Sequence, residues 1–138
     1  MEQKEFFIEF GKALYHIDAI YADFSKKSNV SPTLLWILYA LNDGKVHTQK
    51  DLCYDWSLPK STVNTLISEL KNNDYITLNP IKGKRREMTI LLTSKGKSYA
   101  DSVLENIYKK EKKVFDTFKN QASILLEKLT FLENLLKQ

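Results

Sequence analysis

The chain has 138 residues, 43% of them hydrophobic, and a formal net charge of +4. This length suits one domain-sized unit with a hydrophobic core, and no low-complexity segment or internal repeat stands out. The N-terminus carries acidic residues and no long apolar run, so we expect a cytoplasmic protein with neither a signal peptide nor a membrane span. Cys53 is the only cysteine, which excludes an intramolecular disulfide and a cysteine-based metal cluster.

An N-terminal helix is predicted within residues 1–26. Its apolar residues recur at alternating four- and three-residue steps, a seam that suits packing on other helices: Phe10, Leu14, Ile17, Tyr21 and Phe24. Polar residues 25–29 end this pattern. Ser31 and Pro32 then fit the N-cap and the first position of a second helix. Because that helix is apolar nearly all round, we expect it at the centre of the fold.

A helix-turn-helix is predicted next. Thr48 is a good N-cap for a short helix with one apolar face, formed by Leu52, Cys53 and Trp56. Ser57 and Leu58 form the turn. Pro59 fits the first position of a recognition helix over residues 59–73. The apolar residues of this helix have amphipathic spacing and predict that one side is buried: Val63, Leu66, Ile67 and Leu70.

The other side of this helix presents short polar side chains and one cation. A recognition helix uses its N-terminal residues to reach base edges in the major groove, and its positive end favours phosphates. Asn64 is the best candidate for a bidentate contact to adenine. The alternative is that the polar side chains of this face are ordinary solvated residues that contact no DNA. The candidate DNA contacts of the two helices are Thr48, Gln49, Lys60, Ser61, Thr62, Asn64 and Thr65.

A short basic β-hairpin follows the helix pair. Residues 75–78 and 87–93 have the β-branched and alternating apolar pattern of strands. The loop between them carries four cations: Lys82, Lys84, Arg85 and Arg86. In a wing over residues 79–88, these side chains would reach the phosphates or the minor groove beside a bound helix. The alternative is a solvated loop tip that blunts an edge strand.

The positive charge of the chain is concentrated in this region. Residues 59–97 have a charge balance of +5, whereas the rest of the chain carries −1. Such a distribution is typical of an electrostatic footprint on nucleic acid, and it favours the wing.

Two helices are predicted after the wing, and residues 97–138 are expected to form, with residues 1–26, a helical dimerisation region. The first opens at Thr93 or Ser94 and runs through Phe118, and the second carries apolar residues from Ile124 to Leu136. So much apolar surface at both ends of a small chain needs a partner surface. The simplest is a second copy related by twofold symmetry, which would place two recognition helices about 34 Å apart. The alternatives are terminal helices folded back on their own lobe and a coiled coil with a different protein.

The order of elements and several short runs resemble the MarR family of bacterial transcriptional regulators. The runs are Leu58–Val63, Leu66–Leu70 and Leu92–Gly96, and motif-level similarity spans residues 31–96. The resemblance implies one MarR-like unit over residues 1–138, mostly α-helical with a small β-hairpin wing. It also implies a homodimer, joined through its N- and C-terminal helices, that binds pseudo-palindromic DNA operators. The implied function is that of a transcriptional repressor, without a cofactor, relieved by a small ligand or by oxidation.

The wing departs from the family pattern at one position. The family's wing usually carries an aspartate two residues before its tip arginine, and the matching pair here is Lys84 and Arg86. Arg86 can still enter a narrow minor groove. Lys84 cannot brace the hairpin as a carboxylate would, so we expect a wing that contacts DNA without that brace.

Three aromatic residues could line an effector pocket for an aromatic or amphipathic ligand: Tyr15, Trp36 and Tyr39. Structural packing is the alternative. Cys53 lies on an apolar helix face, as inert packing cysteines usually do, although some relatives sense oxidants through cysteine. His16 and His47 lack a companion carboxylate at a helical ligand spacing, so no metal site is expected.

The sequence offers no glycine-rich phosphate loop, no nucleophile elbow and no carboxylate pair that can be placed in a cleft, so we do not expect an enzyme. A stronger alternative is a winged-helix module that acts through a protein partner instead of DNA. The charge of residues 82–86 discriminates the two, because contact with phosphates makes affinity depend steeply on salt.

Overall fold

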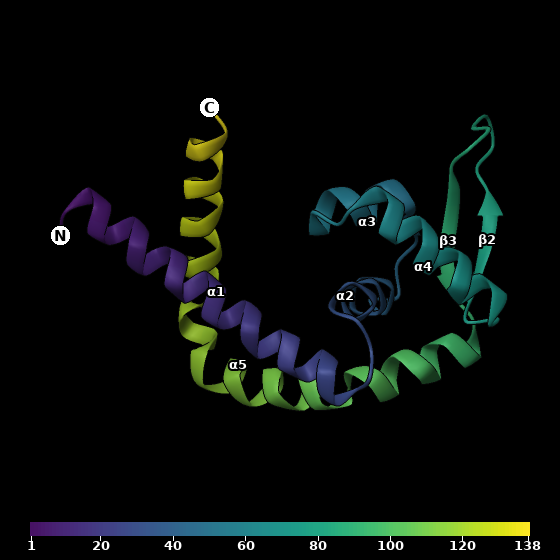
Figure 1. Ribbon diagram of the computed structural model, residues 1–138, viewed down its shortest axis with the longest axis horizontal. Helices are drawn as coiled ribbons and strands as arrows, with labels where there is room; N and C mark the ends of the chain where they lie inside the picture. The colour runs from purple at the N-terminus through teal and green to yellow at the C-terminus, as the bar shows by residue number, and fades with distance from the viewer. The chain divides into compact units, whose positions relative to one another are not determined.

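The computed structural model describes residues 1–138. Its elements in chain order are α1 (Gln3–Lys27), α2 (Pro32–Leu41), β1 (His47–Thr48), α3 (Gln49–Trp56), α4 (Lys60–Asn72), β2 (Ile76–Pro80), β3 (Met88–Leu92) and α5 (Ser94–Lys137). The chain divides into two compact units, residues 1–105 and 106–138, and α5 contributes to both. The predicted winged helix-turn-helix is confirmed and lies in the first unit, with α3 and α4 as the helix pair and β2 and β3 as the wing (Figure 1).

Capping residues set the ends of the central helices. The Ser31 side chain accepts a hydrogen bond from the Leu34 backbone N–H at 3.1 Å, and Pro32 follows as the first residue of α2, as predicted. Ser57 ends α3 in the left-handed region at φ 49°, which turns the chain toward α4. The sequence predicts Pro59 as the first helical residue, but the structure makes it the N-cap. Its backbone is extended, with ψ 128°, so α4 begins at Lys60.

The sheet has three antiparallel strands in the order β1-β3-β2. Leu78 of β2 and His47 of β1 both pair with Ile90 of the middle strand. In Figure 1 the hairpin of β2 and β3 lies beside α4, and its loop extends away from the helices. The sequence did not predict β1, because a two-residue strand is too short for an alternating pattern.

The core of the first unit is built on α2. Five of its ten residues are buried, which confirms its predicted central place. Other elements contribute buried apolar side chains around it: Leu52, Val63, Ile67, Ile90 and Leu104. In contrast, the only buried residue of α1 is Ser25, whose Oγ donates to the Ala22 carbonyl at 2.7 Å. Most of α1 is therefore exposed.

Helix α5 is one continuous helix of 44 residues, where the sequence predicts two. The two predicted helices are separated by residues 119–123, which carry no large apolar side chain. These residues include no glycine or proline, so the backbone continues as helix. No helix of the chain combines the length and the hydrophobicity that a membrane span needs.

Candidate nucleic-acid interface

Helix α4 separates a buried apolar face from an exposed polar one. Val63, Ile67 and Leu70 are at most 4% exposed and hold the helix on the core. The residues predicted on its outer face are all exposed: Lys60, Ser61, Thr62, Asn64 and Thr65. No side chain caps the first turn of α4, so its backbone N–H groups are open to an anion.

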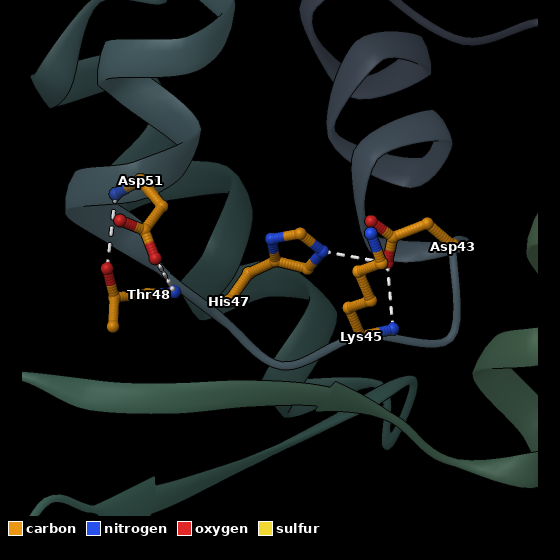
Figure 2. A network of polar contacts seen from close by, with 5 residues as sticks. All are labelled: Asp43, Lys45, His47, Thr48 and Asp51. Carbon is orange, nitrogen blue, oxygen red and sulfur yellow. Dashed lines mark hydrogen bonds and ion pairs between the residues drawn. The ribbon is translucent and has the colours of Figure 1, made fainter.

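A capping box fixes the start of α3 (Figure 2). The Thr48 hydroxyl accepts a hydrogen bond from the Asp51 backbone N–H, and the Asp51 carboxylate accepts one from the Thr48 backbone N–H, both at 3.1 Å. Thr48 is also held from the other side, because it pairs with Thr89 of β3. Gln49 follows directly, and its Nε2 lies 3.5 Å from Oδ1 of Asn64 on α4.

Asp43 holds the loop that leads into β1 (Figure 2). Its Oδ1 accepts a hydrogen bond from the Lys45 backbone N–H at 2.9 Å and lies 2.8 Å from Nε2 of His47. Burial raises the pKa of Asp43, but the hydrogen bonds from His47 and Lys45 outweigh burial and hold the pKa below its ordinary value of 3.8. Sequence analysis missed this partner of His47, although Asp43 lies four residues before it in the chain.

We expect the substitution Asp43→Asn to lower stability near neutral pH and to have a smaller effect in acid. A carboxyl whose pKa is lowered by folding stabilises the folded state above its unfolded pKa. That contribution is lost as the pH falls below 3.8 and through the folded pKa. The effect near neutral pH should be below about 1 kcal/mol, because the pair is partly exposed. Urea unfolding at about pH 6 and about pH 3 measures it. A difference that persists undiminished in acid would contradict the prediction.

The wing presents four exposed cations: Lys82, Lys84, Arg85 and Arg86. Gly83, at φ 83°, allows the tight turn at its tip. Lys84 Nζ lies 3.7 Å from Glu87 Oε2, an exposed ion pair that contributes little stability to the wing. Arg85 and Arg86 form no ion pair within the chain. Their charges are therefore free to meet an anion.

A groove of about 640 Å³ runs between α3, α4 and the wing. Five of the predicted contact residues line it: Thr48, Gln49, Lys60, Asn64 and Arg86. Buried Ile67 and Ile90 contribute apolar atoms to the same lining. The remaining candidates lie on the exposed face of α4 or at the wing tip. Sequence analysis missed one cation of this lining, Lys50, although it directly follows Gln49.

A cluster of aromatic rings joins α1, α2 and α3. Trp36 stacks on Trp56 at a centroid distance of 5.2 Å, and it contacts Tyr21 at 5.0 Å and Tyr39 at 5.7 Å. The structure thus brings Trp36 and Tyr39 of the predicted effector pocket together. Tyr15 takes no part in the cluster, and its side chain is 77% exposed. Sequence analysis placed Tyr21 and Trp56 on other apolar faces and so missed both.

The remaining candidate residues do not form a site of their own. Cys53 is a half-buried free thiol on α3 that lines the groove. His16 is exposed on α1. No group of three His, Cys, Asp or Glu side chains is placed to hold a metal ion. The expectation that Cys53 is an inert packing residue stays a prediction.

No family model matches the chain, and no curated protein matches it in sequence. Solved structures match it closely. The MarR family regulator NMB1585 from Neisseria meningitidis superposes with a TM-score of 0.84 at 27% sequence identity, over 99% of this chain and 95% of that chain. The chain shares the fold of the MarR family and, with this regulator, more than a quarter of its sequence. The match supports its assignment as a DNA-binding regulator of transcription.

Two further structures share the MarR fold at lower identity. NadR in complex with 4-hydroxyphenylacetate has a TM-score of 0.73 at 14% identity and covers 93% of this chain and 89% of its own. Reduced AbfR bound to DNA has a TM-score of 0.70 at 16% identity and covers 99% of each chain. NMB1585 is a regulator, which is consistent with the expectation that this chain is not an enzyme.

Proposed function

We propose that this MarR family protein acts in the cytoplasm as a homodimeric repressor that binds a pseudo-palindromic operator and is released by a small ligand. One observation carries the proposal. The groove places polar residues of α3 and α4 beside a wing whose two arginines have no carboxylate partner. AbfR, which was solved on DNA, has the same fold and supports DNA as the partner.

In this proposal α4 lies in the major groove of the operator. Lys60 suits a phosphate, because its charge adds to the uncapped N–H groups of the first turn. Asn64 suits adenine, since its amide can accept from N6 and donate to N7. Exposed or half-exposed hydroxyls around them can reach base edges or phosphates: Thr48, Ser61, Thr62 and Thr65.

The wing would lie on the flanking minor groove or backbone. Arg86 lines the groove beside α4 and is the residue we assign to the minor groove, where narrow A·T tracts attract cations. Arg85 and Lys84 are assigned to phosphates. Lys84 should contribute less than Arg85, because Glu87 neutralises part of its charge.

Two exposed apolar seams support the homodimer. On α1, Leu14 and Ile17 are 48% and 55% exposed. In the second unit, apolar residues of α5 recur at alternating three- and four-residue steps: Phe115, Phe118, Ala122, Leu125, Leu129, Leu132 and Leu136. Seams of this period pack against other helices. A second copy would cover them and give the twofold symmetry that a pseudo-palindrome requires.

The double substitution Leu125→Glu/Leu129→Glu should convert the dimer to monomer. Two charges placed in an apolar seam cost several kcal/mol, which raises the dissociation constant by at least about 100-fold. Sedimentation velocity over a range of concentrations measures the change. As a control, Asn120→Asp/Gln121→Glu adds the same charge at exposed polar positions of the same helix and should remain dimeric. A wild-type protein that sediments as a monomer throughout would refute the homodimer.

The aromatic cluster supports a small aromatic ligand as the effector. NadR was solved with 4-hydroxyphenylacetate, a compound of this class. We assign the ligand contact to Trp36 and Tyr39, and not to Tyr15, because only the first two belong to the cluster. A ligand bound there would release DNA only if it binds better to a dimer whose recognition helices are spaced wrongly for the operator than to a dimer whose spacing fits.

Tryptophan fluorescence can test this assignment, because both tryptophans of the chain, Trp36 and Trp56, belong to the cluster. Titration with 4-hydroxyphenylacetate and related aromatic acids should change the emission and weaken DNA binding at the same concentrations. A screen in which no such compound does both would contradict the effector assignment.

Sequencing of genomic fragments captured by the purified protein at near-physiological salt tests the proposed function. We expect enrichment of a pseudo-palindrome, and increased expression of the neighbouring genes when the protein is deleted. Decreased expression would contradict repression. If no sequence is enriched at any of several salt concentrations, DNA recognition is refuted, and a module that acts through a protein partner takes its place.

A further inference from the structure

The two amide side chains of the groove lie in contact with each other. Gln49 is the first residue of α3, Asn64 lies in the second turn of α4, and Nε2 of Gln49 is 3.5 Å from Oδ1 of Asn64. Both residues line the groove, where Asn64 is the residue assigned to a base edge. The contact therefore joins the base-reading side chain to the neighbouring helix.

Both ends of this contact are held by the fold. On the Gln49 side, the capping box between Thr48 and Asp51 fixes the first turn of α3, as Figure 2 shows, and the pairing of Thr48 with β3 fixes the backbone before it. On the Asn64 side, Val63 and Ile67 are buried and prevent α4 from rotating. The fold thus sets the backbone positions of Gln49 and Asn64 before any DNA is bound.

The orientation of an asparagine amide decides which base edge it can recognise. Rotation of the amide by half a turn exchanges its oxygen with its nitrogen, and so exchanges an acceptor for donors. In the structure Gln49 presents Nε2, a donor, to Oδ1 of Asn64, which leaves that oxygen on the side of α3. That oxygen keeps a second lone pair for N6 of adenine, while Nδ2 remains free to donate to N7.

We infer that Gln49 is a positioning residue that fixes the amide of Asn64 for adenine and thereby sets the base preference at one position of each half-site. The inference rests on the proposed function. It assigns to Gln49 a role in specificity that needs no contact of its own with a base.

Selection from a randomised duplex library, followed by sequencing, tests the inference. The Asn64→Ala variant identifies the position that Asn64 reads, where the preference for adenine should fall by about tenfold. Gln49→Ala should lower the preference at the same position by about threefold to tenfold and leave the rest of the motif unchanged. Combining the two substitutions should lower it no further than Asn64→Ala alone, because Gln49 acts only through Asn64.

A second substitution tests the direction of the contact. In Gln49→Glu the side chain can only accept, so Asn64 must turn Nδ2 toward α3, and the preferred base should change. Lys50→Gln is the matched control, because it also changes the charge by one negative unit, at the next position of the same groove. It should weaken binding to all sequences and leave the motif as it is. Melting temperatures near that of wild type would show that the variants are folded.

The outcomes separate the inference from the proposed function. If the wild type enriches a motif and Gln49→Ala enriches the same one without loss, the inference is overturned and the proposed function stands. If Gln49→Ala changes a different position, Gln49 reads a base itself and the inference is likewise overturned. If the wild type enriches no motif, the proposed function fails and the inference fails with it.

Discussion

Replacing Gly96 by alanine should destabilise the first unit by about 3 kcal/mol or more. This glycine is buried in the first turn of α5, and an added Cβ would overlap the backbone carbonyl of Tyr75. A side chain could rotate away from such an overlap, but a backbone group cannot. The helix and the start of β2 would have to separate.

That separation would break contacts on which the wing depends. The Thr93 backbone N–H donates to the Tyr75 carbonyl at 3.0 Å, and the Gly96 backbone N–H donates to the Thr93 hydroxyl at 2.9 Å. The rings of Tyr75 and Tyr99 stack at a centroid distance of 4.4 Å. Because these contacts join both ends of the hairpin to α5, the alanine variant should also bind DNA more weakly.

Gly11→Ala provides a matched control. Gly11 also lies in a helix, and no atom lies within 4 Å of an added Cβ. Alanine is the better helix former, so this variant should be more stable by about 0.5–1 kcal/mol. Urea unfolding of the two variants should therefore give changes of opposite sign. A Gly96→Ala protein as stable as wild type would contradict the close approach of α5 to Tyr75.

Local chemistry explains which parts of the fold the sequence could predict. The N-caps at Ser31 and Thr48 and the apolar spacing along α4 depend on residues within a few positions of each other, and the structure confirms all three. Strand β1 forms by pairing with β3, and its two residues are too few to show an alternating pattern in the sequence. The continuity of α5 was missed, although residues 119–123 contain no glycine or proline and the apolar spacing continues through Ala122.

The candidate interface, too, could be predicted from the sequence only in part. Helical periodicity placed Asn64 on the outer face of α4, and the exposure of its side chain agrees. Contacts between elements were not predictable, because they require the relative positions of helices and strands. Gln49 with Asn64, Asp43 with His47 and the ring cluster around Trp36 are of this kind.

The double substitution Arg85→Ala/Arg86→Ala should lower operator affinity by about 100-fold at near-physiological salt, because a dimer would lose four cations at once. Each lost phosphate contact should also reduce the salt slope by about one. The affinities of wild type and variant should then converge as salt rises, since counterion release drives the lost part of binding. Fluorescence anisotropy with the selected operator over a range of salt concentrations measures both quantities.

The matched control is Lys4→Ala/Lys26→Ala, which removes the same charge from exposed positions of α1, an element that contributes nothing to the groove. It should change the affinity by less than the wing variant and leave the slope nearly as it is. The two readouts together locate the contacts of the wing. A lower affinity with a lower slope places the arginines on phosphates. A lower affinity with an unchanged slope means that they act through shape or base contacts in the minor groove. If neither quantity changes, the hairpin is a solvated loop tip, and α3 and α4 alone must carry DNA recognition.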